Sequence, residues 1–138
     1  MKRRSARLAI VCAAAALVAA AGIAVLKGQP APPKVSRTVL LKQDSTVPGR
    51  EVVMAAVEIP PGATEGKHTH PAEVYAYVRE GEIQLFVEGQ PVKTLKAGDV
   101  FAIAPGQVHE GSNKGPATAK LTAVFFAEKG KPLTTPVP

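Results

Sequence analysis

The stretch GATEGKHTHPAEVYAYVREGE, residues 62–82, decides the fold that we predict for this chain. Its second half is a short run of β-branched and aromatic residues that ends at a glycine turn, which is typical of a β-strand. Outward from it, similar runs occupy residues 38–42, 52–59, 74–79, 83–87, 92–95, 100–103 and 119–126. No amphipathic helical pattern longer than two turns follows residue 35. Because short strands must protect their edges, we predict an all-β domain, one β-barrel or jelly roll over residues 35–138.

The N-terminal 27 residues predict an export signal. Residues 2–7 are basic, residues 8–26 carry no charge, and small residues that suit cleavage lie at 19–24. At about 1.5 Å per residue the uncharged run nearly crosses a ~30 Å hydrocarbon core, so a retained membrane anchor helix is the alternative. A Pro-rich linker follows at residues 28–34. We expect the domain to be periplasmic or secreted, or anchored to the cytoplasmic membrane and facing the periplasm.

Charge and composition exclude several partners. The formal net charge is +6, but five of the 17 Lys and Arg residues lie in residues 1–27, which leaves 12 basic and 11 acidic groups elsewhere. The chain has two Tyr, four Phe and no basic stripe, so it lacks the stacking platforms and phosphate contacts of nucleic-acid-binding proteins. Cys12, the single cysteine, lies in the uncharged run, so the domain has no disulfide. A small-molecule partner remains, with membrane contact only through an uncleaved N-terminus.

The spacing of the three histidines predicts a metal site. His68 and His70 are two residues apart, so on a β-strand both imidazoles point to the same side and can converge on one ion. His109 follows the Pro105-Gly106 turn, which can bring a third imidazole alongside them. Taken singly, each histidine would more often be a surface or hydrogen-bonded polar residue. As a set, three imidazoles leave open coordination positions, the pattern of a site that admits water or substrate.

Together with AGDVFAIAPGQVHEGSN at residues 97–113, the opening stretch resembles the two sequence motifs of the cupin superfamily. The first motif is matched by Gly62, His68, His70, Glu73 and Gly81, and the second by Gly98, Pro105, Gly106, His109 and Asn113. The resemblance implies a cupin-type β-barrel around one divalent transition metal, commonly Fe, Mn, Ni, Zn or Cu, and often a homodimer. It also implies that Glu73 joins the three histidines as a metal ligand.

Glu73 departs from the motif, because the usual Glu lies one residue later, where this chain has Val74. A one-residue shift turns a strand side chain to the opposite face, so Glu73 points away from the ion unless a bulge near Pro71 corrects its direction. Both arrangements are open at this point, and an outward Glu73 leaves a three-histidine centre. Tyr75 and Tyr77 either line the cavity or serve in packing.

Three functions fit such a site. The first is an exported, metal-dependent, dioxygenase-like oxidoreductase acting on a small molecule, since an ion with open positions can polarise a carbonyl, activate water or bind dioxygen. The alternative is a non-catalytic module that binds a small molecule or sugar in the barrel. The third is a structural barrel without metal. No catalytic side chain beyond the ligands is assigned, because using a histidine as a base would remove a ligand.

Overall fold

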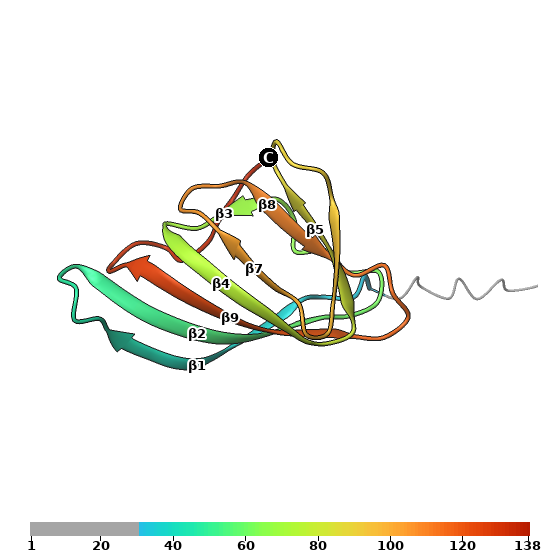
Figure 1. Cartoon of the computed structure of the whole chain (residues 1–138), viewed down its shortest axis with the longest axis horizontal. Helices are drawn as coiled ribbons and strands as arrows, with labels where there is room; N and C mark the ends of the chain where they lie inside the picture. The colour runs from blue at the N-terminus through green and yellow to red at the C-terminus, as the bar shows by residue number, and fades with distance from the viewer. Residues whose placement is uncertain (1–30) are drawn as a thin grey trace, which may run out of the picture. The chain divides into compact units, whose positions relative to one another are not determined.

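Residues 31–138, the part of the chain that this computed structural model describes, form ten β-strands and no helix (Figure 1). The strands are β1 (Ser36–Asp44), β2 (Arg50–Ile59), β3 (His68–Thr69), β4 (Ala72–Glu80), β5 (Glu82–Val87), β6 (Lys93–Lys96), β7 (Val100–Ile103), β8 (His109–Ser112), β9 (Ala119–Glu128) and β10 (Thr135–Pro136). The predicted signal or anchor at residues 1–27 and the start of the linker lie outside the described residues. Within the described range, nothing resembles a helix that is long and apolar enough to cross a membrane.

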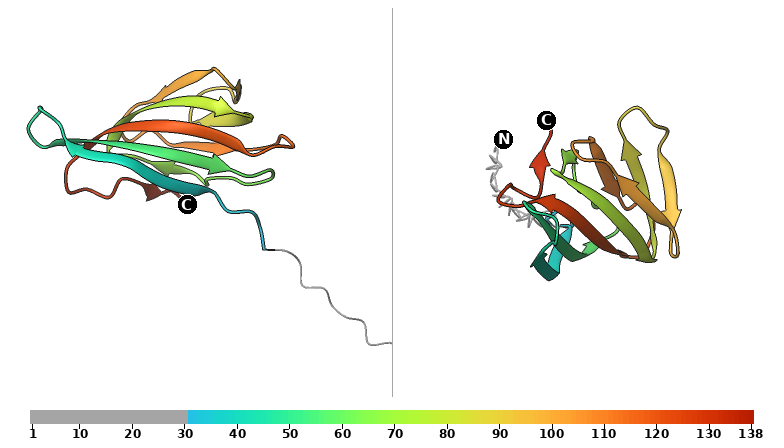
Figure 2. Two further views of the ribbon diagram at one scale, coloured as in Figure 1. Left: turned by 90° about the horizontal axis from the view of Figure 1, so that it is seen from below. Right: turned by 60° about the vertical axis from the view of Figure 1, so that its left-hand side comes forward.

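Two antiparallel five-stranded sheets face each other (Figures 1 and 2). The first has the order β1-β2-β9-β4-β7, and the second has the order β10-β3-β8-β5-β6. Neighbours in each sheet come from distant parts of the chain, as in the pairing of β2 with the late strand β9. The predicted all-β jelly roll is confirmed.

The core lies between the sheets because the central strands alternate buried and more exposed residues. Along β2, β4 and β9 every second residue is buried, which is the pattern of strands with one face toward a core. Leu121 of β9 has Val57 of β2 as its register partner on one side and Val78 of β4 on the other. These inward side chains form one apolar wall beside the histidines described below.

All seven strands predicted from β-branched runs are present, and three further short strands have no such run. β3, β8 and β10 contain two, four and two residues, and they include His, Gly, Ser and Pro rather than a β-branched run. The outward face of β4 carries Tyr75 and Tyr77, whose exposed fractions are 52% and 46%. Neither tyrosine lines the interior, so the cavity-lining alternative is excluded for both.

Asn113 organises the loop that connects β8 to β9. Its side chain is fully buried, and its amide nitrogen donates to the carbonyl oxygens of Ile59 and Ala117, both at 2.7 Å. Its side-chain oxygen accepts a 2.8 Å hydrogen bond from the backbone N–H of Gly115. Three bonds from one buried amide tie the end of β2 to this loop and hold β8 in place.

Candidate metal centre

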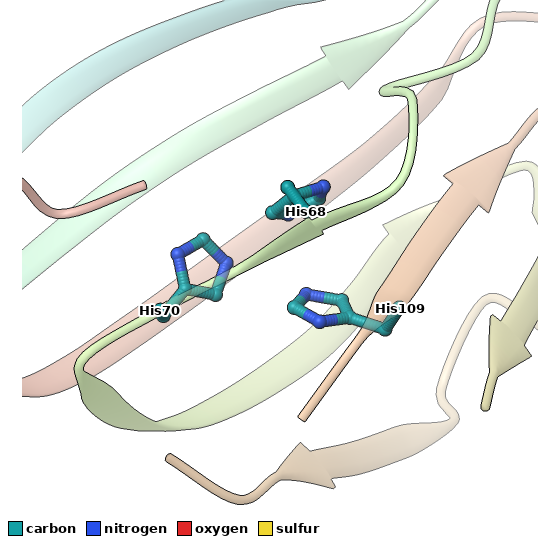
Figure 3. Close-up of side chains that lie close together, drawn as sticks. All are labelled: His68, His70 and His109. Carbon is teal, nitrogen blue, oxygen red and sulfur yellow. The ribbon is translucent and has the colours of Figure 1, made fainter. Parts of the chain in front are cut away.

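The second sheet brings the three histidines together. His68 lies on β3 and His109 opens β8, and the two residues are direct register partners. His70 follows β3 by one residue and is two positions from His68, so its ring points to the same side. Figure 3 shows the three rings gathered around a common space. The expected juxtaposition of a His-x-His strand segment with a distant third histidine is present.

The geometry of this cluster suits a single ion. One ring nitrogen from each histidine lies within 4.8 Å of the other two, and the ring centroids are 4.3, 4.7 and 5.0 Å apart. All three residues are buried, with exposed fractions of 4 to 5%. Nitrogens bound to one ion at about 2.1 Å lie at most about 4.2 Å apart, so a small inward rotation of the rings completes the set. The three histidines could therefore hold a metal ion.

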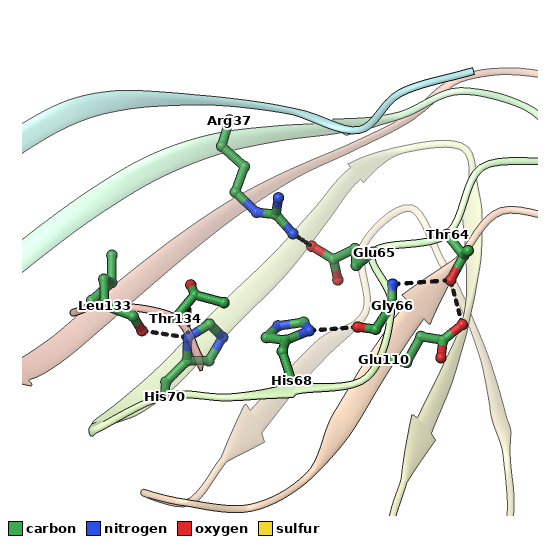
Figure 4. A network of polar contacts seen from close by, with 9 residues as sticks. All are labelled: Arg37, Thr64, Glu65, Gly66, His68, His70, Glu110, Leu133 and Thr134. Atoms are coloured by element: carbon green, nitrogen blue, oxygen red, sulfur yellow. Dashed lines mark hydrogen bonds and ion pairs between the residues drawn. The ribbon is translucent and has the colours of Figure 1, made fainter. Parts of the chain in front are cut away.

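Backbone carbonyls orient all three imidazoles. The Nδ1 atoms of His68, His109 and His70 lie 2.7, 2.9 and 2.7 Å from the carbonyl oxygens of Gly66, Gln107 and Leu133, respectively. A carbonyl oxygen only accepts hydrogen bonds, so each Nδ1 carries a proton and each Nε2 is the ring nitrogen left to bind an ion. Figure 4 shows the contacts of His68 and His70. This second layer of contacts is what a metal-binding histidine needs.

Burial lowers the pKa of two of the three histidines, His70 and His109. Burial lowers the pKa of His70 from 6.5 to about 4, and the charges of the other two histidines and of Arg37 act in the same direction. Burial also lowers the pKa of His109, against the opposing effects of its bond to Gln107 and of the Glu65 carboxylate. Both rings are neutral at pH 7, the protonation state in which imidazole binds metals.

Glu73 does not join the histidines. It lies on the outward face of β4, where it is exposed and its carboxylate accepts a 2.6 Å hydrogen bond from the hydroxyl of Tyr75. No bulge corrects its direction, because the pairing of β4 with β9 is regular from Ala72 to Val78. The inward position belongs to Val74, which is 4% exposed. The resemblance implied that Glu73 is a metal ligand, and the structure corrects this by placing Glu73 on the outward face of β4. The three-histidine alternative fits this site.

A small cavity opens beside the histidines. Its volume is about 40 Å³, room for about three water molecules at ~10–15 Å³ each. Apolar residues from both sheets form most of its wall: Val57, Val74, Ala76, Leu85, Phe101, Leu121, Ala123 and Phe125. Phe125 also supports the cluster, since its ring meets that of His70 edge-on at a centroid distance of 5.0 Å. The cavity admits a ligand of a few atoms.

Two further residues of the cavity escaped the sequence analysis. Glu65 lies in the loop before β3 and forms a 2.7 Å ion pair with Arg37 of β1, and both line the cavity (Figure 4). The position of Glu65 between the motif glycine and His68 is a signal that could have identified it. Arg37 had no such signal, because it reaches the cavity only through the pairing of β1 with β2.

Comparison with known proteins agrees with the cupin motifs in the sequence. The sequence model of the family described as "Cupin domain" matches residues 55–125, just over half of the chain. The chain is similar to germin-like protein subfamily 2 member 2 of Arabidopsis thaliana, with 35% identity over 82 residues, and to germin-like protein 1-1 of Oryza sativa, also with 35% identity over 82 residues. Each match covers 56% of this chain. The chain spans less than half the length of these curated relatives, 37% and 38%.

Solved structures agree with this comparison. A double-stranded β-helix protein from Klebsiella pneumoniae is 26% identical, with a TM-score of 0.63 over 78% of this chain and 87% of that one. An oxalate oxidase is 28% identical, with a TM-score of 0.57 over 63% of this chain and 46% of that one. The family match over residues 55–125 includes all three histidines.

Proposed function

Because the chain belongs to the cupin domain family, we propose that it is a metal-dependent oxidoreductase of small molecules, with His68, His70 and His109 as the ligands of one divalent transition metal ion. The observation that carries this proposal is the convergence of three buried imidazoles, each held through Nδ1, on a cavity with room for a small ligand. Iron, manganese, nickel, zinc and copper all accept imidazole ligands.

The chain's own residues supply binding and orientation. A redox-active ion with open positions would supply electron transfer between a coordinated small molecule and dioxygen. The three carbonyl partners fix the ring orientations, so the Nε2 atoms are arranged before any ion arrives. The apolar wall excludes bulk water and strengthens electrostatic interactions inside the cavity. The similarity to an oxalate oxidase supports redox chemistry on a small oxygen-bearing molecule.

A second candidate is a non-catalytic module that binds a small molecule through the same ion. The outward position of Glu73 favours it, because an uncharged three-histidine set retains the ion's full positive charge for holding an anionic ligand. Turnover distinguishes the two candidates, since both require the metal.

Export and homodimer formation belong to the same proposal. The basic and uncharged segments at residues 1–27 support export. A homodimer is supported by β1, an edge strand whose nine residues are all exposed and include Val39, Leu40 and Leu41. Light scattering on the purified protein tests the dimer, and N-terminal sequencing of protein recovered from the periplasm tests cleavage.

Elemental analysis of the purified protein tests the metal site. We expect about one equivalent of metal in the wild type, its loss in His68→Ala and His109→Ala, and full retention in Glu73→Gln, the matched control. Oxygen uptake with small hydroxy and keto acids then separates the enzyme from the binding module. A folded wild type that takes up no metal after reconstitution would refute both, whereas metal loss in Glu73→Gln would restore the four-ligand site.

A further inference from the structure

The carboxylate of Glu65 lies beside the three histidines in a position built around it. The Glu65 backbone N–H donates to the carbonyl oxygen of Gly111 at 2.9 Å, and the neighbouring Thr64 pairs with Ser112 in an isolated bridge. The loop therefore lies along β8 at Thr64 and Glu65, and it meets β8 again where His68 pairs with His109. The side chain of Glu65 is only 15% exposed.

Gly111 makes the space that this carboxylate occupies. A Cβ atom at Gly111 would lie 2.6 Å from Oε2 of Glu65. Gly111 is buried on β8 two residues after His109, so both positions point into the barrel. It is not among the described glycines with positive φ, so a Cβ atom there would conflict with the carboxylate of Glu65 and not with the backbone.

Arg37 holds the other oxygen of the same carboxylate. Its Nη2 donates to Oε1 of Glu65 at 2.7 Å, and its register partner is Val57, which lines the cavity. The Arg37 side chain is 42% exposed and its guanidinium has five N–H donors, so it can also meet a ligand that enters the cavity. Among the described residues that line the cavity, Arg37 and Glu65 are the two that carry a formal charge at pH 7.

The pair places two opposite charges next to each other beside the cluster. The charge of Arg37 lowers the pKa of His70, and the charge of Glu65 raises the pKa of His109. Glu65 lies outside the set of mutually close ligand atoms but lines the same cavity as the three histidines, so a ligand of the ion in that cavity would meet its carboxylate. A carboxylate there accepts a hydrogen bond from a donor group and repels a second negative charge.

We propose that the Glu65–Arg37 pair selects the ligand of this site, favouring a small monoanion with an adjacent hydroxyl group over a dianion of similar size. The anionic end of the ligand lies toward Arg37 and its hydroxyl group donates to Glu65. This inference rests on the proposed metal site and adds the class of ligand that the site takes.

Cobalt-loaded protein provides the test, because the visible absorption of Co²⁺ reports ligand exchange without turnover. Glycolate and oxalate are titrated separately into the wild type and into Glu65→Gln, which keeps the shape of the side chain and removes its charge. Glu110→Gln is the matched control. Glu110 is the carboxylate of β8, lies on the opposite face of this strand from Gly111 and accepts a hydrogen bond from Thr64. Metal content is measured again after each titration.

We expect Glu65→Gln to reduce the ratio of glycolate affinity to oxalate affinity by about tenfold, the effect of one charge-assisted hydrogen bond. Glu110→Gln should leave the ratio unchanged. Gly111→Ala, which displaces the carboxylate without removing it, should act in the same direction as Glu65→Gln and serves if that variant does not fold.

Each failure has a distinct signature. A wild type that takes up no cobalt overturns the metal site itself. An unchanged ratio in cobalt-loaded Glu65→Gln and Gly111→Ala overturns the selection by Glu65 and leaves the metal site standing. Cobalt loss in Glu65→Gln also overturns it, because Glu65 would then be a ligand of the ion.

Discussion

Deletion of residues 132–138 should weaken metal binding, although none of these residues is a ligand. The deletion removes the Leu133 carbonyl oxygen, which accepts the 2.7 Å hydrogen bond from Nδ1 of His70. Loss of such an orienting partner lowers metal affinity about 10- to 100-fold, or about 1.4–2.7 kcal/mol. The free ring of His70 can then rotate away from His68 and His109.

The same deletion also reduces stability. It removes the partly buried Leu133 side chain, which packs on the core, and the 2.9 Å hydrogen bond from the Val137 N–H to the Lys67 carbonyl oxygen. At about 1 kcal/mol for each of these two and for the lost hydrogen bond between His70 and Leu133, the free energy of unfolding should fall by about 3 kcal/mol. Leu133→Ala is the matched control, because it loses the packing but keeps the backbone carbonyl.

Competition between the protein and a colorimetric zinc indicator measures the affinity, and urea unfolding measures the stability. We expect Leu133→Ala to lose about 1 kcal/mol of stability with unchanged affinity for zinc, and the deletion variant to lose both. A deletion variant that folds and binds zinc with the wild-type affinity would refute the claim that the tail positions His70.

Two further predictions concern the metal-free protein. As the pH falls from about 6.5 to about 4, it should lose about 3 kcal/mol of unfolding free energy through His70, since the unfolded chain takes up a proton at the ordinary pKa of 6.5 and the folded protein only near 4. This contribution is the difference between the wild type and His70→Gln in urea titrations across that range, and parallel curves would contradict it. Asn113→Ala should lower the free energy of unfolding by about 3 kcal/mol, because it removes the three hydrogen bonds of a buried side chain. A loss below about 1 kcal/mol in thermal unfolding would show that water replaces the amide.

Most of the fold was predictable because it depends on local pattern. The long strands show their β-branched runs and their glycine turns in the sequence, and the structure contains every one of them. β3, β8 and β10 were not predictable, because each is a strand only through pairing with a distant segment, as His68 pairs with His109 and Thr135 with Thr69. Short polar segments have no local preference that would predict these contacts.

The direction of the Glu73 side chain shows what motif spacing can and cannot predict. Its one-residue displacement made the outward arrangement one of two alternatives, since strand side chains alternate between faces. Only the regular pairing of β4 with β9 decided between them, because a bulge would have reversed the outcome. Such a bulge depends on the partner strand, which a local pattern does not reveal.

The amino-acid sequence by itself determined the all-β domain and the three histidines, because strand periodicity and His-x-His spacing are local properties. The tertiary structure decided what surrounds these histidines. Leu133 lies 63 residues from His70, and Arg37 lies 28 residues from Glu65, so these contacts exist only once the barrel closes. The three histidines were visible along the chain, whereas their orientation and the charged pair beside them come from pairing between distant strands.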